Sequence, residues 1–202
     1  MADPVPEIKT PYKSEISVAI VYYSQWNHTK KIAEHVLKGA SKVEGVTVDL
    51  YNAKDAIANI DKIQQYDAFI FGSPTYFGSV SAGMKEFFEA TTEFFATRSL
   101  QDKIAAGFTN SASQSGDKQG TLTQIFTYCC QQGMVYVPLG LPATNNKTVH
   151  NMDALNRTSF FSGLATQSFV DGTPETATEK SDLRTAEFFG EKVTRVFVKY
   201  YH

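Results

Sequence analysis

The sequence lacks an excess of either charge and a long apolar run. Its 202 residues carry 19 Lys and Arg against 21 Asp and Glu, and no basic block is longer than Lys30-Lys31. Nucleic acid, which needs a concentrated positive surface, is therefore not an expected partner. No stretch approaches the roughly 18 consecutive apolar residues of a membrane span, and Met1–Glu7 carries acids and prolines instead of an apolar leader. We expect a cytoplasmic protein without membrane insertion, with residues 1–14 as a flexible lead-in.

Cysteine is scarce, and patterns for metal or nucleotide sites are lacking. Cys129 and Cys130 are adjacent, and because neighbouring cysteines strain a mutual disulfide, buried free thiols are expected. The four histidines have no ligand spacing with each other or with acidic residues, so no metal site is predicted. Neither the G-x-x-x-x-G-K-S/T loop nor the G-x-G-x-x-G turn is present. Nucleotide hydrolysis and Rossmann-type dinucleotide binding are therefore disfavoured.

Apolar runs of strand length alternate with segments of helical period. This alternation is typical of βαβ units and predicts an α/β fold with a mostly parallel sheet. The expected strands are 16–23, 46–51, 67–72, 103–109 and 134–139. Four are apolar nearly throughout, as strands covered on both faces must be. In the second, Val46, Val48 and Leu50 alternate with polar residues and predict a more exposed strand.

Apolar stripes at helical spacing accompany these strands. They predict helices over about 29–41, 84–95, 122–130 and 183–200. Residues 140–180 have no sustained period, and a loop of that length is usually functional or mobile. Residues 15–202 are expected to form a single domain, because no repeat or composition shift marks a second one.

Three loops follow expected strands and should meet at one edge of the sheet, where open α/β folds bind ligands. The first is 24–29, Ser-Gln-Trp-Asn-His-Thr, directly before a helix. The free backbone N–H groups of a helix start can hold a phosphate without lysine or arginine, and Ser24, Asn27 and Thr29 add donors. The alternative is that these polar residues only cap the helix.

The other two loops carry complementary chemistry. Residues 72–79, Gly-Ser-Pro-Thr-Tyr-Phe-Gly-Ser, set two aromatic rings beside polar groups, which suits a flat heteroaromatic ring. Residues 110–117, Asn-Ser-Ala-Ser-Gln-Ser-Gly-Asp, are small enough to let backbone approach a ligand. Each loop alone is compatible with ordinary surface, but their convergence favours one shared ligand site.

At this level of detail the sequence resembles a known family. The segments are Tyr22-Tyr23-Ser24, the stretch 71–78 (Phe-Gly-Ser-Pro-Thr-Tyr-Phe-Gly) and the stretch 132–138 (Gln-Gly-Met-Val-Tyr-Val-Pro). Their order and spacing, over about residues 16–140, resemble the Trp-repressor-binding-protein family of flavodoxin-like NAD(P)H:quinone oxidoreductases. The resemblance implies a three-layer sandwich with a five-stranded parallel sheet in the order 2-1-3-4-5. It also implies bound FMN, NAD(P)H as donor, a quinone-like acceptor, and a homodimer or homotetramer.

The resemblance assigns cofactor-binding residues loop by loop. The first loop would hold the FMN phosphate through Ser24, Gln25, Trp26, Asn27, His28 and Thr29. The second would line the isoalloxazine with Pro74, Thr75, Tyr76, Phe77 and Gly78. The third would close its polar edge with Asn110, Ser111, Ala112, Ser113 and Gly116. The flavin itself carries the hydride chemistry, so no acid-base residue is assigned.

The substrate side of the flavin is assigned to Trp26, Tyr76, Phe95 and Gln132. Three of these depart from the family pattern, which has Arg, Trp and His where this sequence has Tyr76, Phe95 and Gln132. Alternatives to the enzyme are an electron-carrier flavodoxin and a non-catalytic FMN-binding scaffold. Carriers are usually strongly acidic, and the net charge of −2 favours the enzyme.

Overall fold

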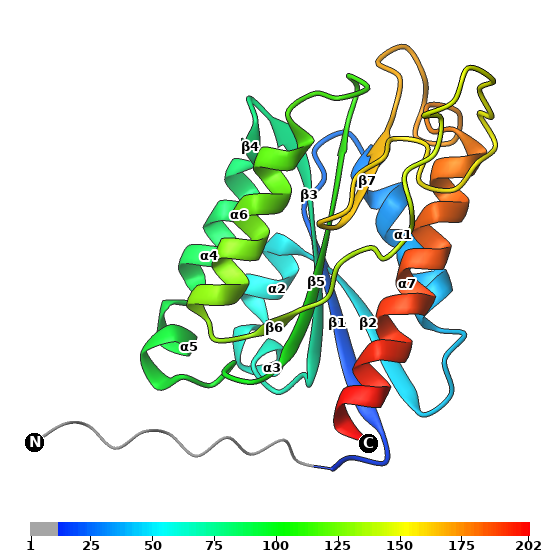
Figure 1. Ribbon diagram of the computed structural model, residues 1–202. Helices are drawn as coiled ribbons and strands as arrows, with labels where there is room; N and C mark the ends of the chain where they lie inside the picture. The colour runs from blue at the N-terminus through cyan, green and yellow to red at the C-terminus, as the bar shows by residue number, and fades with distance from the viewer. Residues whose placement is uncertain (1–11) are drawn as a thin grey trace, which may run out of the picture.

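A central sheet lies between two layers of helices (Figure 1). The computed structural model describes residues 12–202, so residues 1–11 of the expected lead-in lie outside the described part. One face of the sheet is covered by α1 (His28–Ala40) and α7 (Lys180–Tyr201). The other face is covered by α2 (Ala53–Ala58), α3 (Ile60–Ile63), α4 (Ala82–Ala90), α5 (Thr92–Thr97) and α6 (Lys118–Gln131). The expected three-layer α/β sandwich is confirmed.

Five parallel strands run through the centre in the order β2-β1-β3-β5-β6. Their bounds are β1 Ile16–Tyr22, β2 Val46–Asn52, β3 Ala68–Tyr76, β5 Ile104–Ser111 and β6 Val135–Tyr136. Taken as the five expected strands, they have the order 2-1-3-4-5, which is confirmed. β2 forms the edge and is partly exposed along its length, as its alternating pattern predicted.

The fifth strand is split, which the sequence did not predict. β6 pairs only with the start of β5, and the ladder ends at Val137, whose N–H donates to the Ala105 carbonyl. Pro138 has no N–H to continue the ladder, and the chain leaves the sheet until β7 (Leu164–Gln167) pairs with the end of β5. The irregular region 140–180 therefore contributes a strand to the carboxyl edge of the sheet.

The remaining differences concern short elements. A two-residue strand, β4 (Ser79–Val80), folds back on the end of β3 through a turn at Phe77 and Gly78, both at positive φ. α2 and α3 follow β2, where no helix was expected. The helix expected over 84–95 is two helices, α4 and α5, that meet at Thr91.

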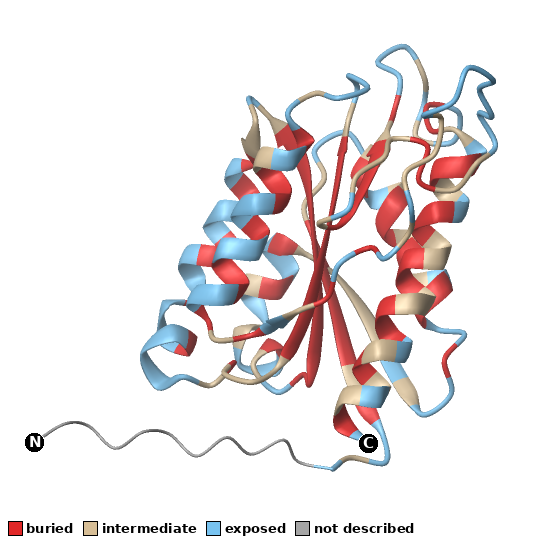
Figure 2. Cartoon of the chain, in the orientation of Figure 1, coloured by how far each residue is buried: buried red, intermediate tan, exposed pale blue. Residues whose placement is uncertain are grey.

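Both faces of the sheet are buried in apolar cores (Figure 2). Ile20 and Phe108 pack toward α1 and α7, whereas Phe69, Phe71 and Phe87 pack on the side of α4 and α6. A slip of one residue in any inner strand would send each side chain into the wrong core. The strand ends, and with them the loops of the carboxyl edge, are thereby held in register.

The helices α1 and α7 touch backbone to backbone. A Cβ atom built on Gly39 would lie 1.9 Å from the Glu187 carbonyl oxygen, and one on Gly190 would lie 2.0 Å from the Val36 carbonyl oxygen. Only glycine fits at either position, since real side chains do not approach backbone that closely. His35 Nδ1 and Glu187 Oε1, 2.9 Å apart, add a polar contact between the two helices. α7 therefore sets the position of α1.

The two cysteines differ in environment. Cys129 is buried in α6, where burial raises the pKa of its thiol, but Cys130 is exposed. The expectation that both thiols are buried is wrong for Cys130, because adjacent residues of a helix point about 100° apart and only one can face the core. Neither forms a disulfide among residues 12–202. No helix in this range is long and apolar enough to span a bilayer.

Candidate functional site

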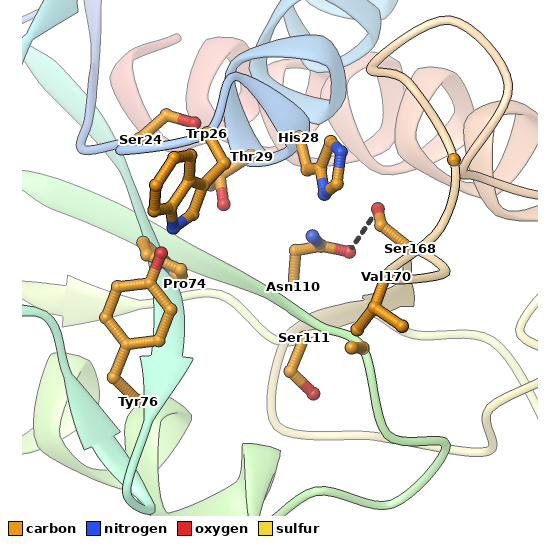
Figure 3. Close-up of a pocket in the computed structure, with 12 residues that line it drawn as sticks. Ser24, Trp26, His28, Thr29, Pro74, Tyr76, Asn110, Ser111, Ser168 and Val170 are labelled. Atoms are coloured by element: carbon orange, nitrogen blue, oxygen red, sulfur yellow. Dashed lines mark hydrogen bonds between the residues drawn. The ribbon is translucent and has the colours of Figure 1, made fainter.

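A cavity of about 490 Å³ opens at the carboxyl edge of the sheet (Figure 3). Nine of its lining residues belong to the three loops singled out in the sequence: Ser24, Trp26, His28, Thr29, Pro74, Tyr76, Asn110, Ser111 and Ala112. The volume lies within the usual range of cofactor pockets, roughly 300–1,000 Å³. The lining contains no Asp, Glu, Lys or Arg, so an anion bound here would be held by backbone N–H groups, hydroxyls, amides and the His28 ring.

The amino end of α1 reaches this cavity through His28 and Thr29. The N-cap residue, Asn27, has a φ of 62° and makes no capping hydrogen bond with its side chain. The first backbone N–H that is bonded belongs to Lys31, which donates to the Asn27 carbonyl at 3.0 Å. The N–H groups of residues 28–30 have no partner in the described part of the chain. The capping alternative is therefore not realised at Asn27, and the helix start is open to an anion.

An aromatic wall bounds one side of the cavity. Figure 3 shows Trp26, Pro74 and Tyr76 along this side. Trp26 is 67 % exposed, which leaves its ring available to a flat ligand. Burial, followed by the nearby Tyr23, raises the pKa of Tyr76. The phenol stays protonated at neutral pH and can donate a hydrogen bond.

Asn110 presents an amide donor from the floor of the cavity. Its Oδ1 accepts from the Thr166 hydroxyl at 2.8 Å and from the Ser168 hydroxyl at 3.0 Å. Asn110 is only 4 % exposed, and its Nδ2 donates to no other described residue. A buried amide with a saturated oxygen and a free NH₂ is suited to an acceptor atom of a ligand.

Three lining residues, Ser168, Val170 and Gly172, were missed in the sequence. They follow β7, so they reach the carboxyl edge for the same reason as the other loops. The signal that could have found them is the short run from Leu164 to Val170, bounded by Gly163 and Asp171-Gly172. It was hidden because a four-residue strand inside a long irregular stretch has too little periodicity to stand out.

Two residues of the second loop lie in other places than expected. The Thr75 hydroxyl is buried 2.8 Å from the hydroxyls of both Thr109 and Thr121, so it faces the core instead of the cavity. The Phe77 side chain is fully exposed at the tip of the β3–β4 hairpin, with Gly78 next to it. Neither side chain lines the cavity, and the expected contact of both with a bound ring stays a prediction.

Several other expected residues border the cavity without lining it. Gln25 and Asn27 belong to the first loop but are not among the lining residues. Ser113 and Gly116 lie further along the third loop, where the Ser113 carbonyl accepts a hydrogen bond from the Lys118 ammonium. The expected contacts of these four residues with FMN stay predictions.

Phe95 and Gln132 do not line this cavity but lie toward the opposite end of the molecule, and their expected position on the substrate side stays a prediction. Both line a separate groove between α4, α5 and α6. Helices of a βαβ unit run antiparallel to its strands, so the residues that end α5 and α6 lie at the amino edge of the sheet. Gln132 is buried there, and its Nε2 donates to the Thr91 hydroxyl at 3.2 Å.

Comparison with known proteins places this geometry in a family. The family model described as NADPH-dependent FMN reductase matches residues 24–148, from the first loop of the cavity to beyond β6. The chain belongs to the NADPH-dependent FMN reductase family.

Relatives of this FMN reductase family member carry two kinds of name. The flavodoxin FldP of Pseudomonas aeruginosa is 35 % identical over 182 residues, which cover 88 % of this chain and 94 % of that protein. A protein named NAD(P)H dehydrogenase (quinone) from Geobacter sulfurreducens is 29 % identical and covers 91 % of this chain and 98 % of its own. One of the same name from Acidithiobacillus ferrooxidans is 28 % identical, with 89 % and 96 % covered.

A solved structure has a fold similar to that of this family member. The flavodoxin, WrbA-like protein from Agrobacterium tumefaciens superposes with a TM-score of 0.71 at 28 % identity, over 92 % of this chain and 99 % of that one. Within residues 12–202, no group of three or more His, Cys, Asp or Glu side chains is placed to hold a metal ion.

Proposed function

We propose that this protein is an FMN-dependent oxidoreductase that takes two electrons from NAD(P)H and passes them to a quinone. The observation that carries the proposal is the uncapped amino end of α1, which opens into a cavity with an aromatic wall. The family description supports the flavin. The two relatives named NAD(P)H dehydrogenase (quinone) support the donor and the acceptor.

The residues around the cavity fit FMN group by group. The free N–H groups at the start of α1, with the Ser24 and Thr29 hydroxyls, suit a phosphate dianion. Trp26 and Tyr76 offer rings to the isoalloxazine. The free amide NH₂ of Asn110 suits a carbonyl oxygen or ring nitrogen at the polar edge of the flavin.

When bound, FMN supplies the hydride chemistry. The chain's own residues then have three tasks: they hold the phosphate, orient the ring and leave one side of it open to donor and acceptor in turn. The exposed Trp26 ring and the exposed Val170 border that opening. We propose that residues 15–202 act as one FMN-binding domain and that the protein works in the cytoplasm.

A one-electron carrier is the second candidate, because the flavodoxin FldP is 35 % identical to this chain. Such a carrier would use the same cavity for FMN but deliver electrons to a protein partner. The near-neutral charge of this chain favours the enzyme, since carriers attract their partners through strongly charged surfaces.

The visible absorbance spectrum distinguishes these functions. The protein is incubated with FMN, desalted, and mixed anaerobically with NADH or NADPH. Retained flavin bands that bleach within seconds and recover when a quinone is added are the expected result. Retained bands that do not bleach would support the carrier, and a colourless protein would contradict FMN binding.

The Tyr76→Ala substitution is expected to lower quinone turnover about tenfold while changing the free energy of unfolding by about 1 kcal/mol or less. Tyr76 lines the cavity from the end of β3 and supports no inner part of the sheet. Phe77→Ala is the matched control, because this neighbouring ring is fully exposed and should affect neither quantity. Parallel losses of melting temperature and turnover in Tyr76→Ala would mark the ring as structural instead.

The Asn110→Asp substitution is expected to weaken FMN binding about tenfold, since it replaces the free NH₂ donor with a charged acceptor. The carboxylate still accepts from Thr166 and Ser168, so the floor of the cavity stays bonded. Fluorescence titration of FMN into the apoprotein measures the effect. Asn151→Asp, in an exposed loop, is the control. Unchanged FMN affinity in Asn110→Asp would remove this residue from the site.

The subunit number is part of the same proposal. We propose a homodimer or homotetramer. Phe95 and Gln132 lie far from the cavity of their own chain, so in such an assembly they would reach only a substrate bound in the cavity of a neighbouring subunit. Light scattering coupled to size exclusion measures the mass in solution. A monomer that still reduces quinones would remove both residues from the substrate side.

A further inference from the structure

A fully buried lysine lies behind the third loop of the cavity. Lys118 opens α6, and its relative exposure is 0 %. Its Nζ donates to the carbonyl oxygens of Ser113 and Gln114, to the latter at 3.0 Å. No carboxylate in the described residues is within ion-pair distance of it. A buried ammonium held mainly by backbone carbonyls is costly, which calls for a reason.

The same loop is tied from its other side. The Gln167 Nε2 donates to the Ala112 carbonyl at 2.9 Å, and the Gln167 N–H donates to the Asp182 carboxylate at 2.8 Å. Arg157 pairs with that carboxylate at 2.9 Å, and both side chains are buried. Residues 112–114 are thus held between α6 on one side and β7 with α7 on the other.

The buried charges of this region do not cancel. Lys118 and Arg157 bring two positive charges, and Asp182 of α7 brings one negative charge. Burial lowers the pKa of Lys118 to about 8; Asp182 opposes this change and Arg157 adds to it. Near neutral pH one positive charge therefore remains in excess behind the loop.

The geometry of the peptide unit shows what the lysine does to the loop. In a trans peptide the C=O and the following N–H point in opposite directions. When Lys118 holds the Ser113 and Gln114 carbonyls inward, the N–H groups of Gln114 and Ser115 point away from it. In the described structure, no backbone N–H of residues 113–117 donates a hydrogen bond. They remain available to a ligand or to water.

We propose that Lys118 is a positioning residue that holds loop 112–117 in the shape that closes the FMN site. It acts through the Ser113 and Gln114 carbonyls and touches no ligand itself. Ser111 and Ala112, where this loop leaves β5, line the cavity, so a change in the loop reaches the site directly. The inference rests on the proposed function, because the bound group is FMN.

Lys103 provides a matched control at the other end of the same strand. It directly precedes β5, and its Nζ donates to two backbone carbonyls, those of Gln64 at 2.6 Å and Tyr66 at 2.7 Å. Burial lowers its pKa to about 8 as well, with Asp67 opposing and Lys13 adding to the change. The chemistry is the same, but this end of β5 is remote from the cavity.

The test compares Lys118→Met with Lys103→Met by FMN titration and thermal unfolding. We expect Lys118→Met to raise the FMN dissociation constant about tenfold without a large loss of melting temperature, since no ion pair is broken and methionine fills a similar buried volume. Lys103→Met should leave FMN affinity unchanged. Equal FMN affinity in Lys118→Met and wild type, or an equal loss in both variants, would overturn the inference. If wild type itself binds no FMN, the proposed function fails and the inference falls with it.

The pH profile of FMN affinity is the second readout. In wild type, affinity should fall as the pH rises through about 8, where Lys118 loses its charge, and Lys103→Met should keep this profile. Lys118→Met should have a flat profile over the same range, which a merely structural lysine would not explain. Should Lys118→Met fail to fold, the wild-type profile decides, because a flat profile there contradicts a role for the charge.

Discussion

Replacing Thr29 with glutamate is expected to abolish FMN binding. Thr29 lines the cavity in the first turn of α1, where the free N–H groups would hold the phosphate. A carboxylate there lies beside the phosphate, and at about 4 Å and an effective dielectric constant near 20 one pair of like charges costs about 4 kcal/mol. The dissociation constant should therefore rise by at least about 1,000-fold. Equilibrium dialysis or fluorescence titration of the apoprotein measures it.

The fold should survive this change, which separates loss of the site from loss of structure. α1 has no acidic residue in its first turn, and a negative charge at a helix start is favourable by about 0.3–1 kcal/mol. Thr29 is only 2 % exposed, so the favourable helix-end position has to offset the burial of the larger side chain, and the melting temperature of Thr29→Glu is measured beside the titration. Thr29→Val is the matched control, since it removes only the hydroxyl and should weaken binding about tenfold. Retained FMN affinity in Thr29→Glu would place the phosphate elsewhere.

Gly190→Ala is expected to destabilise the protein by about 3 kcal/mol, although alanine is the better helix former by about 1 kcal/mol. The added Cβ would lie 2.0 Å from the Val36 carbonyl oxygen and 3.0 Å from the Ala40 nitrogen, both backbone atoms that cannot rotate away. α7 must therefore move off α1. Because the amino end of α1 forms the phosphate side of the cavity, FMN affinity should fall together with stability.

Chemical denaturation of the apoprotein, with FMN titration in parallel, checks this expectation. Lys199→Ala, at an exposed position of the same helix, should change the unfolding free energy by about 0.5 kcal/mol or less. Gly39→Ala should behave like Gly190→Ala, because its Cβ would meet the Glu187 carbonyl oxygen at 1.9 Å. A gain of stability in Gly190→Ala would show that the helices are not in backbone contact.

The parts of the fold that could be predicted are the strands and helices that a local pattern of apolar and polar side chains identifies. The inner strands are apolar on both faces, so the runs around Ile20, Phe69 and Ala106 revealed them and their order along the chain. β7 was missed because its pairing depends on where Pro138 ends β6 and on how the chain returns, which no local pattern records. The split between α4 and α5 at Thr91 likewise depends on tertiary packing.

The site could be predicted loop by loop but not side chain by side chain. Strand ends place Ser24, Thr29 and Asn110 at the cavity, since topology alone carries them there. The orientation of Thr75 could not be read, because its neighbours Thr109 and Thr121 come from other elements. The hydrogen bonds from Lys118 to the Ser113 and Gln114 carbonyls could not be predicted either, since an isolated lysine at a helix start usually lies in solvent.

The backbone contact between α1 and α7 has a consequence for synthesis on the ribosome. His35 and Glu187, which meet across it, are 152 positions apart, and contacts of such sequence separation form late because a long loop must close first. At about 5–20 residues per second, translation reaches α7 on the order of 10 s after α1. During that interval α1 can pack on the sheet but lacks its contact with α7. The chain should therefore gain affinity for FMN in one step, when residues 180–201 dock on α1.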